Sequence, residues 1–120
     1  MIIVTQKNKV AISTLNEMAK KMFGNLVKAV VDIKQEIMAI DGELHADEEV
    51  LLTENGSKRA DVWGVIFYPE YFGQKNFVEF DSMINLKPFL GNRNRGVDDP
   101  EIRKKILEIV GNLVIKNDEK

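Results

Sequence analysis

The sequence has no cysteine among its 120 residues and only one histidine. Disulfide frameworks, thiol catalysis and zinc sites held by cysteine are therefore excluded, and a structural zinc site has no second histidine to use. No run approaches the ~20 apolar residues of a membrane-spanning helix, and the first residues lack the apolar core of a secretory signal. We expect a cytoplasmic protein with no membrane segment, no metal and no cofactor.

The chain also lacks an excess of charge of either sign. Lys and Arg number 17 and Asp and Glu number 19, so the formal net charge is -2. General binders of nucleic acids or membrane surfaces need a clear excess of basic residues, and the balance argues against both classes. The hydrophobic share of 44% is ordinary for a globular protein. We predict one domain over residues 1–120, with a frayed tail at 116–120.

Helical periodicity is clearest near the C-terminus. Asp98 or Asp99 stands before Pro100, which is a favoured start for a helix. An apolar stripe follows at helical spacing and predicts one buried face. Its members are Ile102, Ile106, Ile109, Val110 and Leu113.

A second helix is predicted after residue 12. Thr14 and Glu17 have the spacing of a capping box, and Gly24 supplies a stop.

Residues 46–55 are ambiguous: Asp47 could cap a short helix, or Asn55 and Gly56 could form the turn of a hairpin. We favour the short helix.

Alternating and β-branched residues predict strands at residues 1–4, 27–33, 37–41, 61–68 and 76–86. The second and third of these should form a hairpin, and the last two should pair antiparallel. Strands and helices do not alternate regularly, so a doubly wound fold is disfavoured. The predicted class is α+β, with an antiparallel or mixed sheet of about four strands covered by an N-terminal and a C-terminal helix.

The first candidate site is the loop 91–96, which carries Arg93 and Arg95 between two glycines. Each guanidinium offers a planar fork of donors, and glycine lets backbone amides approach a ligand. With Asn92 as a third ligand-binding residue, the loop is predicted to hold an anion. In the alternative interpretation, the two aspartates that follow the loop neutralise the arginines.

The second candidate site surrounds His45. The nearby carboxylates would raise the pKa of this imidazole and could make it a catalytic acid or base near neutral pH, with Asp47 as its partner. The plainer interpretation is a surface or capping histidine. Glu79 and Asp81 form a weaker candidate, because two carboxylates on one strand face are usually a solvated surface.

Three segments of the chain are distinctive, and they include GELHADEE, EFDSMINLKP and GNRNRGVDDPEIRKKI. Together they resemble a family of small prokaryotic proteins classed as a domain of unknown function. The resemblance runs from about Leu15 to Val114 and implies no assigned catalytic or binding residue.

Three functional hypotheses remain open. The first is a small binding or interaction module, in which the Arg93/Arg95 loop and a neighbouring strand edge recognise an anionic small molecule or an acidic protein partner. The second is a small hydrolase or nuclease in which His45 is the acid or base and the arginines stabilise a phosphate. The third is a structural subunit of a homo-oligomer. Whether the protein is an enzyme is left open by the sequence.

Overall fold

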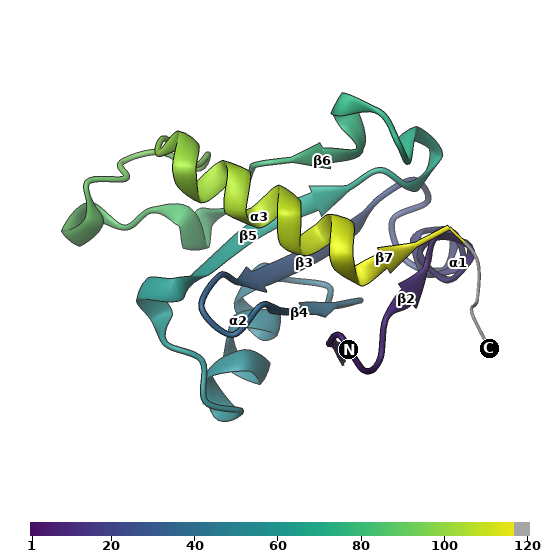
Figure 1. The fold of residues 1–120 in the computed structure, drawn as a ribbon, viewed down its shortest axis with the longest axis horizontal. Coiled ribbons are helices and arrows are strands. Elements are labelled where there is room, and N and C mark those ends of the chain that lie inside the picture. The colour runs from purple at the N-terminus through teal and green to yellow at the C-terminus, as the bar shows by residue number, and fades with distance from the viewer. Residues whose placement is uncertain (117–120) are drawn as a thin grey trace.

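The computed structural model of the protein describes residues 1–116, which form a five-stranded antiparallel sheet with helices on both faces (Figure 1). The strand order is β1-β4-β3-β5-β6. The sheet strands are β1 (Ile2–Val4), β3 (Val27–Asp32), β4 (Ile37–Ile40), β5 (Val62–Phe67) and β6 (Val78–Glu79). A separate parallel pair joins β2 (Val10–Ala11) to β7 (Val114–Ile115). The helices are α1 (Ile12–Lys21), α2 (His45–Glu54) and α3 (Pro100–Leu113). This arrangement confirms the predicted α+β class.

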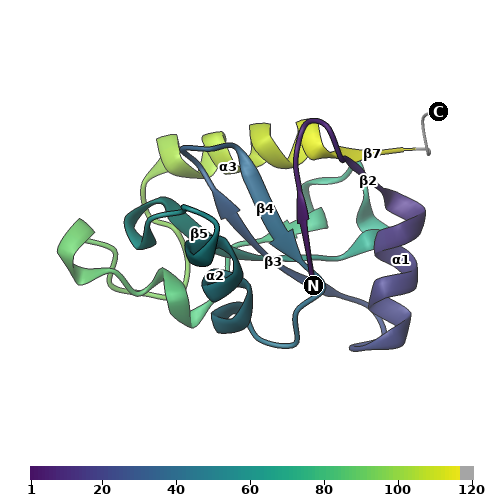
Figure 2. The same cartoon turned by 90° about the horizontal axis from the view of Figure 1, so that it is seen from below.

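Two apolar layers enclose the sheet. The larger layer contains the buried faces of α1 and α3, while α2 packs on the opposite side through Leu52. Figure 2 shows α3 and α2 on opposite sides of the strands. All six residues of β5 are buried, because both of its faces are covered. Successive side chains of β3 point to opposite faces of the sheet, as in any strand. Val31 therefore packs in the larger layer and Val30 in the layer that contains Leu52.

The two helices predicted with a polar start differ in how they begin. In α3, Pro100 is the first helical residue and the Asp99 carboxylate accepts a hydrogen bond from the Glu101 N–H at 2.8 Å, so the predicted start is confirmed with Asp99 as the cap. The helix favoured for residues 46–55 is also confirmed. It begins earlier than predicted, because Leu44 rather than Asp47 occupies the capping position.

The start predicted for α1 is wrong. The helix begins at Ile12 after Ala11, without a side-chain cap, so Thr14 and Glu17 form no capping box. The reason is tertiary: Ala11 pairs with β7 and the chain passes directly from that strand into the helix. The predicted stop is correct, since Gly24 has a φ of +97° and its N–H donates to the Ala19 carbonyl.

The strand predicted at 76–86 is mostly wrong. Only Val78–Glu79 pair with β5, and the chain then turns at Ser82 into a short 3-10 helix, Met83–Asn85. The Ser82 hydroxyl accepts a hydrogen bond from the Ile84 N–H at 3.3 Å and so competes with strand pairing.

Within residues 1–116, no helix is long and apolar enough to cross a membrane. A frayed tail is predicted at 116–120, and all of these residues except Lys116 lie outside the described part of the chain.

Candidate functional site

The two arginines lie on a projecting segment, residues 83–95, which we call the arginine loop. In Figures 1 and 2 this segment extends beyond the end of the sheet, between β6 and the start of α3. Lys87 and Asn92 close a small hairpin, because each backbone N–H donates to the carbonyl of the other, at 2.9 and 3.1 Å. Between them lie the 3-10 helix Pro88–Leu90 and Gly91, whose φ of +81° favours glycine.

Buried side chains attach the arginine loop to the domain. The Asn85 side-chain oxygen accepts from the Gly64 N–H at 2.8 Å, and its amide nitrogen donates to the Gly64 carbonyl at 2.9 Å. The side chain thus makes the two hydrogen bonds that a neighbouring strand would make with Gly64 of β5. The Lys87 ammonium is fully buried and donates to the Arg59 carbonyl at 2.8 Å. These anchors fix the loop relative to the sheet.

Asn92 organises the loop from inside. Its side-chain amide donates to the carbonyls of Asn85, Asn94 and Gly96, and its oxygen accepts from the Asp98 N–H at 2.9 Å. The residue is only 5% exposed. All of its polar atoms are therefore used by the loop, and we leave Asn92 out of the ligand-binding set proposed below.

Large apolar side chains stand at the tip of this rigid hairpin. Phe89 is 63% exposed and Leu90 is 48% exposed, and Met83, which begins the preceding 3-10 helix, is 62% exposed. Exposed apolar side chains that occur singly need no explanation, whereas a group of them on one projection indicates a contact surface. The sequence signal for this tip is the pair of large apolar residues between Pro88 and Gly91.

The arginines retain free hydrogen-bond donors. Within residues 1–116, the exposed Arg93 side chain has no hydrogen-bond or ion-pair partner. Among the described residues, Arg95 donates only through Nε, to Asp81 Oδ1 at 2.7 Å. The aspartates after the loop have other roles, since Asp98 accepts from the Asn94 amide and Asp99 caps α3. The order of the loop thus comes mainly from its asparagines, and the two aspartates that follow the loop do not pair with its arginines in residues 1–116.

His45 is the first residue of α2, and its ring is held against β5. Its Nε2 donates to the Val65 carbonyl at 2.8 Å, so Nδ1 carries the lone pair in the neutral ring. Burial lowers the pKa of His45 below 6.5, and this effect outweighs the hydrogen bond that opposes it. The predicted rise in this pKa is therefore wrong: desolvation of the ring exceeds the attraction of the nearby carboxylates.

The structure does not join the two residues of the predicted catalytic pair. Asp47 is exposed on α2, and no hydrogen bond connects it to His45 in the described part of the chain. Burial is the largest cause of the lowered pKa of His45 and the charge of Arg95 is a smaller one, so the two side chains lie within electrostatic reach of each other. The other predicted carboxylates have partners: Tyr68 Oη donates to Glu79 at 2.8 Å, and Asp81 accepts from Arg95.

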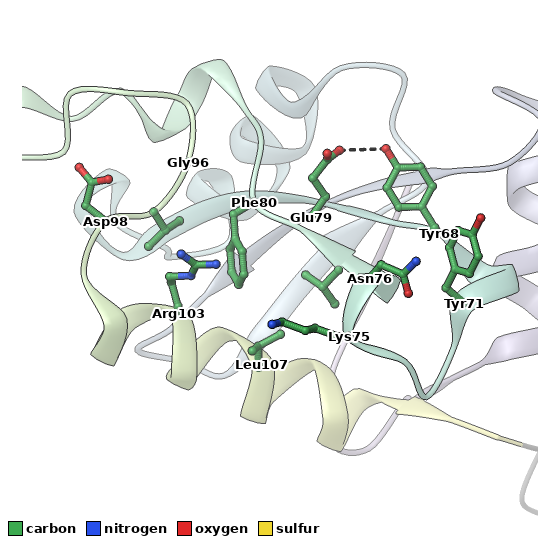
Figure 3. Close-up of a pocket in the computed structure, with 12 residues that line it drawn as sticks. Tyr68, Tyr71, Lys75, Asn76, Glu79, Phe80, Gly96, Asp98, Arg103 and Leu107 are labelled. Atoms are coloured by element: carbon green, nitrogen blue, oxygen red, sulfur yellow. Dashed lines mark hydrogen bonds between the residues drawn. The ribbon is translucent and has the colours of Figure 1, made fainter.

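A groove lies beside the arginine loop, between α3 and the outer edge of β6 (Figure 3). Its volume is about 570 Å³. Val78 and Phe80 line it from the strand side, and Arg103 and Leu107 line it from the helix. Leu107 is 47% exposed although it belongs to a packed helix. The groove is thus partly apolar, with the cation of Arg103 toward one end and that of Lys75 also in its lining.

Within residues 1–116, no group of three or more His, Asp or Glu side chains is arranged to hold a metal ion.

Comparison with known proteins identifies a family but no function. No curated protein and no solved structure matches the chain. One family model, described as "Protein of unknown function (DUF5674)", matches residues 2–113. Since this match covers nearly all of the chain, the protein belongs to the DUF5674 family of proteins of unknown function.

Proposed function

We propose that this protein is a small interaction module that binds a partner protein through the arginine loop. The partner surface would present an apolar pocket for Phe89 and Leu90, with carboxylates at its border for Arg93 and Arg95. One observation carries this proposal: two large apolar side chains are exposed on a hydrogen-bonded hairpin, and three residues after them stands an arginine without a partner in residues 1–116.

The composition of the tip favours a protein over a small anion. Aromatic residues, Met and Arg are enriched at protein interfaces, and buried aromatic and arginine side chains dominate their energetics. A small anion would contact the guanidinium groups but would leave Phe89 and Leu90 in water. A partner with an acidic border around an apolar pocket would satisfy both kinds of side chain.

The rigidity of the loop also supports a binding role. Ordering a flexible loop on association costs free energy, whereas a loop held in place beforehand avoids most of that cost. Asn85, Lys87 and Asn92 supply this order through buried hydrogen bonds. Three buried polar residues at the base of an exposed apolar tip are hard to explain by folding alone.

Affinity capture from cells of the source organism tests the proposal. Two loop variants are compared with the unchanged protein, Phe89→Ser with Leu90→Ser, and Arg93→Ala with Arg95→Ala. For a partner bound through hot-spot residues, each variant should reduce recovery at least about tenfold. The affinity of the purified partner for the unchanged protein and for each variant is then measured by calorimetry.

A matched control removes exposed apolar surface elsewhere. Leu44 and Val50, which are 54% and 52% exposed, are replaced by Ser and should leave partner recovery unchanged. Because Phe89 and Leu90 are also exposed, their replacement should change the free energy of unfolding by less than about 0.5 kcal/mol. A partner that survives both loop variants, or that is lost with the control, would contradict the proposal.

Two other outcomes identify a different ligand. If loop-dependent sedimentation occurs with anionic vesicles and no protein is captured, the tip binds a membrane surface instead. If the solution mass corresponds to two copies and falls to one copy in the Phe89→Ser, Leu90→Ser variant, the partner is a second copy of the chain. That result would support the homo-oligomer hypothesis.

A hydrolase or nuclease activity is the second candidate. The neutral His45 ring with its Nδ1 lone pair, within the electrostatic reach of Arg95, is the observation that favours it. Hydrolysis of p-nitrophenyl phosphate and of single-stranded RNA is measured for the unchanged protein and for His45→Asn. A general acid or base contributes about a hundredfold or more, so activity that does not depend on His45 rejects this role.

A further inference from the structure

The groove beside β6 is a separate surface with its own recognition chemistry. β6 is the last strand of the sheet, and Tyr68 donates its N–H to the Phe77 carbonyl at 2.9 Å. Hydrogen-bonded and non-hydrogen-bonded pairs alternate in an antiparallel ladder. The Phe77 carbonyl and the backbone groups of Glu79 therefore point toward β5, while the Phe77 N–H donates to the Gln74 carbonyl, and the N–H and carbonyl of Val78 point outward. An extended chain can pair with such an edge.

The groove continues along α3 beyond the part shown in Figure 3. A second compartment of about 320 Å³ shares Val78 and Leu107 with the first and ends at Gly111. Its apolar walls include Phe72 and Val110. Because Gly111 has no side chain and nothing lies within 4 Å of its Cβ position, this end of the groove is open to a bulky apolar group.

The charges at the other end favour a carboxylate. The Arg103 guanidinium lies over the Phe80 ring, 4.7 Å from its centroid, and has no carboxylate partner in residues 1–116. The acidic residues of the groove already accept hydrogen bonds, Glu79 from Tyr68 and Asp98 from Asn94. Hydrogen bonds from neutral donors leave the negative charge of these carboxylates in place, so the complementarity to a negative ligand is local to the Arg103 guanidinium, which has no ion-pair partner in residues 1–116.

We infer that this groove binds an extended segment of a partner protein, which adds to β6 as an outer strand. Its carboxylate contacts Arg103, and its bulky apolar side chain fills the compartment at Gly111. Arg103 and Gly111 are separated by eight helical residues, about 12 Å. This length corresponds to about four residues of a strand. The recognised sequence thus has Asp or Glu four positions from Phe, Leu or Ile, with both side chains on one face.

A displayed library of extended pentapeptides tests this inference, with random residues at all five positions. Selection on the unchanged protein should enrich an acidic and a bulky apolar residue at the two ends. The best peptide is then synthesised and its affinity is measured by fluorescence polarisation. Methylation of its central backbone amides, which removes the strand hydrogen bonds, should weaken binding at least about tenfold.

Two variants of the protein address the two ends of the groove. Arg103→Glu and Gly111→Leu should each weaken the peptide at least about tenfold, because the first repels the carboxylate and the second fills the apolar compartment. Lys104→Glu is the matched control for charge and should have less than a twofold effect. Replacing Gly by Leu within a helix favours helix formation, so Gly111→Leu should remain folded, as circular dichroism would verify.

The inference is overturned if no peptide is enriched, or if the enriched peptides bind equally well to both groove variants. It does not depend on the arginine loop. The Phe89→Ser, Leu90→Ser variant should bind the peptide with unchanged affinity even though it is expected to lose the loop's partner. Failure of one surface is therefore distinguishable from failure of the other.

Discussion

Glu48 gives the protein an unusual dependence of stability on pH. The side chain has no exposed surface, and Oε2 accepts one hydrogen bond, from the Gly42 N–H at 2.9 Å. No described residue pairs with Oε1. Burial raises the pKa of Glu48 from its ordinary 4.5 to about 9. The carboxyl is therefore neutral in the folded protein at pH 7, and Glu48→Gln should preserve its shape while removing the ionisation.

The magnitude follows from proton linkage. The unfolded chain releases this proton above pH 4.5, whereas the folded protein keeps it until about pH 9. Over this interval the unfolded state binds fewer protons than the folded state, so the free energy of unfolding falls by about 1.4 kcal/mol per pH unit. Between pH 5 and pH 8, this single group removes about 4 kcal/mol of stability. The Glu48→Gln variant lacks that loss.

Urea unfolding at several values between pH 5 and pH 8 measures the effect. Relative to the unchanged protein, Glu48→Gln should gain about 4 kcal/mol as the pH rises across this range. Glu54→Gln, at the exposed end of the same helix, serves as the control and should follow the unchanged protein. If the difference between Glu48→Gln and the unchanged protein were the same at every pH, the reasoning about Glu48 would be refuted.

Two further predictions concern the attachment of the arginine loop. Asn92→Ala leaves several carbonyls without donors and should lower the free energy of unfolding by about 2–3 kcal/mol, measured in urea, whereas Asn112→Ala on exposed helix surface should not. Gly64→Ala would place a Cβ in steric clash with the Ser82 side chain and should cost about 1–3 kcal/mol. Adding Ser82→Gly should restore most of this loss in thermal unfolding; if the double variant is no more stable than Gly64→Ala, the clash is not the cause.

Local signals predicted the elements whose ends are set by nearby residues. Asp99 and Pro100 start α3 by interactions within one helical turn, and Gly24 ends α1 through its own backbone conformation. The hairpin of β3 and β4 was predicted for the same reason, since a short polar turn separates two β-branched runs. In each case the determining contacts span only a few residues of sequence.

The features that escaped prediction depend on contacts distant in sequence. Residues 80–86 alternate like a strand, but Asn85 hydrogen-bonds to Gly64 of β5 and the chain turns away from the sheet. Glu48 lies in the first turn of α2, where an acidic residue is usually exposed, and the sheet buries it. The lowered pKa of His45 has the same origin, because its burial against β5 cannot be read from its acidic neighbours.

The arginine loop has some features that the sequence predicts and others that depend on contacts distant in sequence. Its arginines were recognisable from the sequence, because guanidinium groups between glycines are uncommon and chemically specific. The anchoring by Asn85, Lys87 and Asn92 was not, since each of these side chains reaches a carbonyl whose position depends on the fold. The exposure of Phe89 and Leu90 follows from that anchoring, because the hairpin projects away from both apolar layers.

Site-specific photo-crosslinking in cells of the source organism tests the central claim most directly. A photoreactive amino acid replaces Leu90, at the tip of the arginine loop, or Val50, which is similarly exposed on α2. The proposal predicts a discrete adduct with one partner protein from position 90, none from position 50, and loss of the adduct when Arg93 and Arg95 are changed to Glu. An absent adduct at position 90, or an equal adduct at both positions, would contradict it.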